Sequence, residues 1–425
     1  MPEFQTSPGM RDILPPESAR WRHFQAVFAK IVMSAGYGEI IAPIMEDVGV
    51  FQRVGDATDV VTKEMYDFVD RGQRHVALRP EQTASVCRAF AQHRPLTPWK
   101  VFYGGPNFRY EKPQRGRYRQ FDQVGIEVLG ADDPYLDVEV IAVGWQFLRT
   151  LGLQQVTVIL NSLGEPDDRS SYVQALGEYF ATHFDSLSPE SQITLAKNPL
   201  RVLDSKRRQD TAIVAAAPRI ASFYSQAAAE HFAAVQQGLH DAGIPFMIDT
   251  TLVRGLDYYR HTTFEYSGGT LDSAQNALGG GGRYDGLVES LGGPPTHGVG
   301  FALGLDRILI ACDDEGVFPA PNTAVEVFVV DTTGGREALL ITTCLRAAGI
   351  SCDRAFANKS MKSQMKGADR SGAQVALIIG SNELDDGTVV VRPLRGADSQ
   401  RAVPRTDLIP EVLQALEQAA KEATA

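Results

Sequence analysis

A basic segment between two apolar stretches constrains the fold of this chain most strongly. Five basic residues lie within the eleven positions 109–119, with one acidic residue among them. Strand-like residues precede the segment at 101–103 and follow it at 124–129, and the segment itself contains glycine and proline. This order is typical of a β-hairpin that presents charge at its tip. Guanidinium groups bind phosphate through paired hydrogen bonds, so we predict a phosphate-binding hairpin, although charge density alone also fits a solvated loop.

Changes in sequence pattern divide the 425 residues into two predicted domains. Residues 1–320 mix helical and strand patterns, and positions 165–235 within them have helical periodicity without a clear strand, which predicts a helical insertion. A proline-rich linker at 317–323 ends this part. Beyond it, residues 324–425 alternate strand and helix patterns, which predicts a small α/β domain.

The composition argues against several classes of protein. The net charge is −11, so any contact with nucleic acid must come from local basic patches on an acidic body. The four cysteines form no CxxC pair and have no histidines at zinc spacing, so we expect neither a structural zinc nor a disulfide framework. Residues 1–18 contain no apolar core, and no long apolar run follows them. We therefore expect no signal peptide, no membrane-spanning segment and a cytoplasmic location.

Three further segments place charged or aromatic residues beside glycines or at helix starts. They are the sequence RGLDYY at 254–259, a glycine-rich stretch at 298–307 that ends in arginine, and RPEQT at 79–83. Each segment has an ordinary structural interpretation when it is taken alone: a packed turn, a surface ion pair, or a carboxylate that complements a helix dipole. Four glycines at 279–282 fit either a flexible turn or a close backbone approach.

The combination of these segments resembles the histidyl-tRNA synthetase family of class II aminoacyl-tRNA synthetases, in its bacterial form. Residues 109–127 resemble motif 2, residues 298–307 resemble motif 3, residues 254–259 resemble the histidine-specific motif, and residues 36–43 resemble motif 1. The resemblance covers essentially the whole chain. It implies an α+β catalytic domain built on an antiparallel sheet, a small C-terminal anticodon-binding α/β domain, and a homodimer.

The resemblance also implies an ATP-dependent, AMP-forming ligase. Such an enzyme activates histidine to histidyl-adenylate and transfers it to the 3′ end of tRNA(His). Attack of a carboxylate on the α-phosphate needs positioning and charge neutralisation more than a protein nucleophile. By resemblance, Arg109 binds the α-phosphate, Arg307 binds the γ-phosphate and Arg254 stabilises the transition state. Glu111 belongs to the same ATP site. Mg²⁺ accompanies ATP, and its ligands are not assigned.

The same resemblance assigns an amino-acid pocket and the contacts with tRNA. Oxygen atoms suit the ammonium group, and an imidazole needs a partner for each ring nitrogen. The expected histidine-binding residues are Glu81, Thr83 and Gln123 for the ammonium, Glu127 and Tyr259 for the imidazole, and Tyr258 and Tyr284 as pocket walls. The tRNA is expected to contact the hairpin loop from Lys112 to Arg117, which includes Gln114 and Arg115. It is also expected to contact basic residues within 354–370, which otherwise form a solvated helix face.

Two other functions compete with this interpretation. A catalytically inactive paralogue, the regulatory subunit of ATP phosphoribosyltransferase, shares the catalytic fold but commonly lacks the anticodon domain and much of the histidine-specific motif. This chain has RGLDYY at 254–259 and an α/β pattern after residue 323, which favours the ligase. A general ATPase is not supported, because the sequence contains no GxxxxGK[ST] loop.

Overall fold

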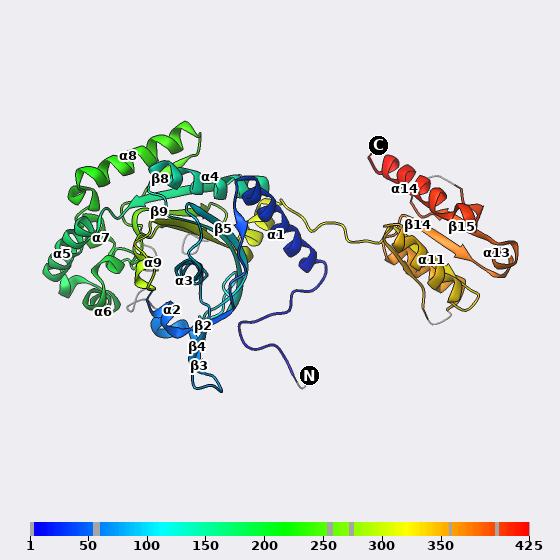
Figure 1. The fold of residues 1–425 in the computed structure, drawn as a ribbon, viewed down its shortest axis with the longest axis horizontal. Coiled ribbons are helices and arrows are strands. Elements are labelled where there is room, and N and C mark those ends of the chain that lie inside the picture. The colour runs from blue at the N-terminus through cyan, green and yellow to red at the C-terminus, as the bar shows by residue number, and fades with distance from the viewer. Residues whose placement is uncertain are drawn as a thin grey trace. The chain divides into compact units, whose positions relative to one another are not determined.

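The protein forms two compact units, Met1–Ala320 and Pro321–Ala425 (Figure 1). The computed structural model describes residues 4–53, 60–252, 258–271, 276–356, 359–395 and 399–424. Among the helices of these residues, none has the length and apolarity that a membrane crossing requires. The two units are described one after the other.

An eight-stranded sheet forms the centre of the first unit, in the order β1-β5-β6-β11-β10-β9-β7-β8. Neighbouring strands run antiparallel except at the two edges, where β1 pairs with β5 and β7 pairs with β8 in parallel. The antiparallel sheet predicted from the sequence is therefore confirmed. The strands are β1 Gly38–Glu39, β5 Trp99–Phe108, β6 Gln120–Leu129, β7 Val156–Ser162, β8 Phe246–Ile248, β9 Arg260–Gly268, β10 Ala277–Arg283 and β11 Gly298–Gly304.

Helices α1 (Glu17–Ser34) and α4 (Pro134–Thr150) pack on this sheet through aromatic side chains. Phe28 of α1 lies 5.1 Å from Phe147 of α4, 6.3 Å from Phe102 of β5 and 6.4 Å from Phe301 of β11, measured between ring centroids. The buried residues of α1, among them Phe24, Phe28 and Ile31, recur at helical spacing and so lie on one face of the helix. This packing fixes the strands that carry the candidate site.

A second group of elements surrounds the start of α3 (Thr83–His93). Three short strands, in the order β2-β4-β3, form a small antiparallel sheet next to it in the sequence. Buried residues of α2, α3, β5 and α9 share one apolar cluster. The bounds of the remaining elements are β2 Met45–Asp47, α2 Val48–Gln52, β3 Tyr66–Val69, β4 His75–Leu78, α9 Leu287–Ser290 and α10 Leu305–Glu315.

The predicted insertion is helical. The structure describes the stretch from Ser162 to Phe246 in full, and that stretch contains no strand between β7 and β8. Its helices are α5 Pro166–Thr182, α6 Pro189–Lys197, α7 Thr211–Ala216 and α8 Gln226–Asp241. Buried residues such as Leu176, Phe180 and Ile220 give it an apolar cluster of its own.

The second unit is a five-stranded sheet with helices, in the strand order β13-β12-β14-β15-β16. Strand β12 pairs in parallel with β13 and β14, and β15 pairs antiparallel with β14 and β16. This arrangement confirms the predicted α/β fold. The elements are β12 Val327–Asp331, α11 Arg336–Ala347, β13 Cys352–Arg354, α12 Met361–Arg370, β14 Val375–Ile379, α13 Ser381–Asp386, β15 Thr388–Pro393, β16 Arg401–Pro404 and α14 Leu408–Thr424.

Candidate active site

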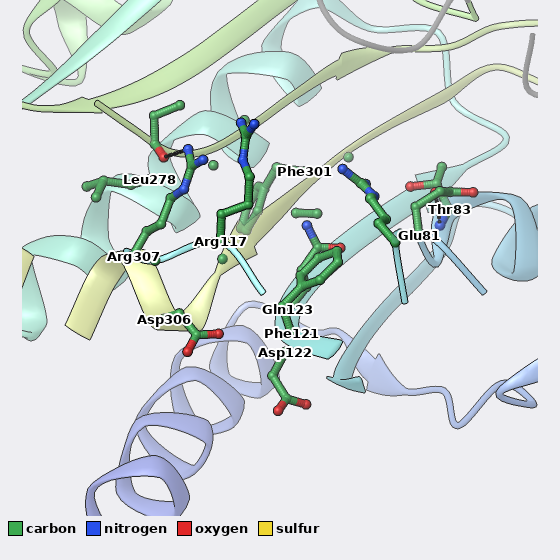
Figure 2. Close-up of a pocket in the computed structure, with 18 of the residues that line it drawn as sticks. Glu81, Thr83, Arg117, Phe121, Asp122, Gln123, Leu278, Phe301, Asp306 and Arg307 are labelled. Atoms are coloured by element: carbon green, nitrogen blue, oxygen red, sulfur yellow. Dashed lines mark hydrogen bonds between the residues drawn. The ribbon is translucent and has the colours of Figure 1, made fainter. Parts of the chain in front are cut away.

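A cleft in the first unit gathers most of the predicted site residues (Figure 2). Its lining comes from the start of α3, the hairpin between β5 and β6, strands β6, β10 and β11, and the first turn of α10. Figure 2 shows Glu81 and Thr83 at one end and Arg117 and Arg307 at the other. The predicted residues that line the cleft are Glu81, Thr83, Arg109, Glu111, Gln123, Glu127, Tyr258, Tyr259, Tyr284 and Arg307.

The carboxylate end of the cleft comprises Glu81, Thr83, Glu127 and Tyr284, and Glu127 lies at its centre. Thr83 Oγ1 donates a hydrogen bond to Glu127 Oε1 at 2.7 Å, and Tyr284 donates its phenolic hydroxyl to Oε2 at 2.5 Å. Tyr103 donates a third bond to Oε1 at 3.1 Å. The Glu127 side chain is 1% exposed, and this burial raises its pKa to about 8, although the three hydroxyl donors oppose the shift.

Glu81 is a second buried carboxylate at this end. It accepts backbone N–H groups from Thr83 at 2.7 Å and Ala84 at 2.9 Å, where α3 begins. Burial raises the pKa of Glu81, while these backbone bonds and the nearby Arg109 lower it. Glu81 therefore complements the helix start and also faces the cleft, so the structural and functional interpretations of this residue are compatible.

Glycine makes room for the Glu127 carboxylate. A Cβ atom at Gly300 of β11 would lie 1.9 Å from Glu127 Oε2. The four glycines 279–282 lie inside strand β10 and not in a turn, which favours the close-approach interpretation over the flexible turn. At Gly281, a Cβ atom would lie 1.9 Å from the carbonyl oxygen of Gly300 on the paired strand. A side chain at Gly300 would therefore clash with the Glu127 carboxylate, and one at Gly281 would clash with the backbone of β11.

The arginine end comprises Arg109, Arg117, Arg307 and the carboxylate of Glu111. Arg109 Nε donates to the carbonyl oxygen of Pro80 at 2.9 Å, and Arg307 Nη1 donates to that of Ala277 at 3.0 Å. Arg117 pairs with Glu111 at 2.9 Å. Burial lowers the pKa of Arg307, and the neighbouring charges of Arg117 and Arg109 lower it further. Three cations around one carboxylate favour a polyanionic ligand.

The structure adds residues to the predicted set. Arg117, which the sequence grouped with the tRNA-facing loop, lines the cleft and extends to the same side as Arg307 (Figure 2). Phe121 lines the cleft beneath the guanidinium of Arg109, whose central carbon lies 5.2 Å from the ring centroid. Tyr103 contacts Glu127 from the adjacent strand. The pairing of strands β5 and β6 could have indicated Tyr103. Val101 pairs with Glu127, and side chains alternate along β5, so Tyr103 lies on the same face of the sheet as Glu127.

Two predicted residues, Gln114 and Arg115, do not line the cleft. Arg115 is 73% exposed and pairs with Asp314 of α10 at 3.2 Å, and Gln114 is exposed beside it at the hairpin tip. Arg254 lies outside the described residues. Within the part of the chain that the structure describes, no group of three metal-ligating side chains is found.

The chain is similar to proteins of known family. The family model described as histidyl-tRNA synthetase matches residues 9–308, and the one described as anticodon binding domain matches residues 326–415. The histidine–tRNA ligase of Limosilactobacillus fermentum is 44% identical over 416 residues, with 96% of each chain covered. That of Thermosynechococcus vestitus is 45% identical over 412 residues, again with 96% of each chain covered.

A crystal structure of apo S. aureus histidyl-tRNA synthetase aligns with 96% of this chain and 99% of its own, at 34% identity and a TM-score of 0.81. The family match at residues 9–308 spans both ends of the cleft and the hairpin between them. The fold, the cleft and the full-length similarity agree, and the chain belongs to the histidyl-tRNA synthetase family.

Proposed function

We propose that this chain is an ATP-dependent histidine–tRNA ligase, which forms histidyl-adenylate and then transfers histidine to the 3′ end of tRNA(His). One observation carries this proposal: a single cleft holds two buried carboxylates and three arginines, with Arg117 and Arg307 at the end opposite Glu81 (Figure 2). Amino-acid activation needs both, because an ammonium group must be held while a carboxylate meets an α-phosphate. Relatives that are named histidine–tRNA ligase and align with 96% of the length of this chain support the proposal.

The carboxylate end would bind histidine. Glu81, Thr83 and Gln123 would hold the ammonium group, and Glu127 and Tyr259 would pair with the two imidazole nitrogens. Glu127 would accept the N–H of one imidazole nitrogen, and a positive charge on the imidazole would oppose the burial that raises the pKa of Glu127 to about 8. Tyr258 and Tyr284 would form walls, which is consistent with the 5.8 Å between their ring centroids.

The arginine end would bind ATP. Arg109 would contact the α-phosphate, Arg307 would contact the γ-phosphate, and Arg254 would stabilise the charge that develops during in-line displacement. Mg²⁺ would enter with ATP and neutralise phosphate charge, since Mg²⁺ is usually bound by one or two carboxylates together with phosphate oxygens. Glu111 fits that requirement, because it lies in the cleft beside Arg117.

Two separate surfaces would contact tRNA(His). Gln114 and Arg115 are exposed at the hairpin tip, outside the cleft. In the second unit, Lys362, Lys366 and Arg370 follow one face of α12 and line a shallow pocket. Phosphate contacts of this kind supply most of the sequence-independent affinity for a nucleic acid. The match to an anticodon-binding domain at residues 326–415 supports the second surface.

We also propose a homodimer. Strand β1 lies at an edge of the large sheet, and the segment after it carries Ile41, which is 88% exposed. Apolar residues beside a free sheet edge favour pairing with another chain. The segment coincides with the sequence that resembles motif 1. A cytoplasmic location stays a prediction from the sequence.

ATP–pyrophosphate exchange with each standard amino acid in turn tests the proposed function. Histidine alone is expected to stimulate exchange, because Glu127 and Tyr259 offer a partner to each imidazole nitrogen. Exchange that no amino acid stimulates would instead favour the regulatory paralogue. Adding tRNA(His) then tests the second step, which should consume the histidyl-adenylate.

A further inference from the structure

The N-terminal strap, defined as residues 4–16, runs against the basic hairpin. The backbone N–H of Arg119 donates to the carbonyl oxygen of Gly9 at 2.8 Å. Gly9 has a positive φ of 79°, and a Cβ atom there would lie 2.7 Å from Cγ of Arg119. A glycine therefore lets the strap approach the hairpin at this point.

Arg11 of the strap contacts three separate segments. Its guanidinium carbon lies 5.5 Å from the ring centroid of Trp21 on α1 and 5.0 Å from that of Tyr118 on the hairpin. Its Nη1 donates to Glu17 at 2.9 Å, and its Nη2 donates to Asp306 of α10 at 3.0 Å. One side chain thus joins the strap, the hairpin and the start of α10.

Two of the residues that Arg11 contacts, Tyr118 and Asp306, line the cleft, and each is a sequence neighbour of an arginine at the arginine end. Tyr118 follows Arg117, and Asp306 precedes Arg307. In Figure 2, Asp306 and Arg307 extend in opposite directions from the start of α10. The Asp306 side chain is 7% exposed, and burial raises its pKa while Arg11 opposes the shift. Arg11 therefore compensates a buried carboxylate next to Arg307.

We propose that Arg11 is a positioning residue for ATP, because it joins Tyr118 to Asp306 and so fixes the spacing between Arg117 and Arg307. This inference rests on the proposed ATP-dependent function. Like charges repel, so Arg117 and Arg307 tend to separate before an anion binds. A second link between hairpin and α10, from Arg115 to Asp314, is largely exposed and contributes little. Arg11 is the better shielded link of the two.

The matched control is Arg20, which joins α1 to α10 without taking part in the proposed link. Arg20 Nη1 pairs with Asp313 at 2.6 Å, and its Nε donates to the carbonyl oxygen of Phe318 at 2.7 Å. Arg20→Ala removes an arginine–aspartate pair between these helices, as Arg11→Ala removes the pair with Asp306. A purely structural role for Arg11 predicts that both variants behave alike.

The experiment measures KM for ATP and for histidine by pyrophosphate exchange, together with ATP affinity by calorimetry without histidine. Arg11→Ala should raise KM for ATP on the order of tenfold and leave KM for histidine unchanged, because a displaced phosphate-binding group weakens only the ligand that it contacts. Arg11→Lys should recover part of the loss, since it keeps the charge beside Asp306 but not the planar group. Arg20→Ala should leave both KM values at the wild-type level.

Equal KM for ATP in Arg11→Ala and wild type would overturn the proposal, as would equal losses for both substrates. If Arg11→Ala does not fold, Arg11→Lys and Gly9→Ala decide, because Gly9→Ala pushes the strap away from Arg119. Each should raise KM for ATP selectively, and a wild-type value in both would overturn the proposal. Calorimetry separates failure of the proposed ligase function from failure of the role proposed for Arg11. Wild-type protein that binds ATP but shows no histidine-stimulated exchange would contradict the ligase function. The ATP affinities of the variants would still test Arg11.

Discussion

The two ends of the cleft differ in the sign of their charged groups and in how far the protein itself compensates them. At the carboxylate end, Glu127 is 1% exposed and accepts three hydroxyl hydrogen bonds from the protein itself. At the arginine end, Arg117 is 41% exposed and shares the single carboxylate of Glu111 with Arg109. The first end is assembled before a ligand arrives, whereas the second gathers like charges that an anion must neutralise. The proposed histidine site is therefore preorganised, while the proposed phosphate site would be completed by its substrate.

The two ends of the cleft differ in charge and burial although one strand contributes residues to both. Strand β6 carries Phe121 near the arginine end and Glu127 at the carboxylate end. Burial increases along this strand, from the exposed Gln120 through half-buried residues to fully buried ones at its end. Desolvation, and not the choice of secondary structure, thus separates a site of charged groups from one in which burial raises the pKa of a carboxyl group.

The largest effect is expected for Arg254, which lies outside the described residues and is proposed to act with the arginine end. Arg254→Ala should reduce the rate of adenylate formation by about 10²–10³-fold with little change in binding, because it removes a donor that acts on transition-state charge. Arg254→Lys should rescue poorly, since lysine lacks the planar group. Single-turnover kinetics measure this rate, with Arg260→Ala as a control because Arg260 lines a different cavity. Near-normal adenylate formation in Arg254→Ala would remove it from the site.

The carboxylate end is tested by Glu127→Ala. Loss of this hydrogen-bonding partner should weaken histidine binding by about 1.5–3 kcal/mol, or roughly 10- to 150-fold, and leave ATP binding unchanged. Calorimetry with each ligand measures both affinities. Glu139→Ala is a control, since Glu139 pairs with Lys100 outside the cleft. Wild-type affinity for histidine in Glu127→Ala would mean that the imidazole is recognised elsewhere.

Substitutions at the hairpin tip should affect ligand binding at neither end of the cleft. Replacing Gln114 and Arg115 together by alanine should spare pyrophosphate exchange and slow transfer to tRNA(His) by about tenfold, the equivalent of 1.4 kcal/mol. Losing one phosphate contact should also flatten the log–log salt dependence of tRNA binding by about 0.7 to 0.9. Exchange and transfer assays on the same preparation make the comparison. Equal losses in both would place the tip at the ATP site.

Stability should also depend on pH, by no more per pH unit than the free-energy effect expected at the hairpin tip. The pKa of Glu127 is raised to about 8 in the folded protein, so between that value and the unfolded pKa near 4.5 the folded state binds the extra proton. The stabilisation is complete below the lower pKa and is lost as pH rises through the higher one. Wild type should lose at most about 1.4 kcal/mol per pH unit relative to Glu127→Gln in this window. Urea unfolding without histidine measures it, and parallel pH curves would contradict the assignment.

Most of the residues selected from the sequence lie in one cleft, but the partners of their side chains were not predicted. Motif order was enough to select Glu127 and Arg307, which the structure places in one cleft. It did not separate Arg117 from the loop that precedes it, because a basic hairpin offers no local signal for which side chain turns inward. Arg11 was missed for a stronger reason: its partner Asp306 is 295 residues away in the sequence, and no local pattern predicts such a contact.

The glycines show where sequence patterns leave alternatives open. Residues 279–282 fitted both a turn and a close approach, and the structure places them within a strand. Position 281 requires glycine because a Cβ atom there would clash with the carbonyl oxygen of Gly300 on the neighbouring strand. Such a requirement depends on strand pairing, which the sequence of either strand alone does not contain.

Separate binding of the two substrates tests the division of the cleft most directly. Calorimetric titration of ATP and of histidine into Glu127→Ala and Arg307→Ala gives four affinities to compare with wild type. Glu127→Ala should weaken only histidine, and Arg307→Ala should weaken only ATP, because each residue contacts one end of the cleft. A variant that weakened both ligands equally would contradict the division into a preorganised histidine end and a substrate-completed phosphate end.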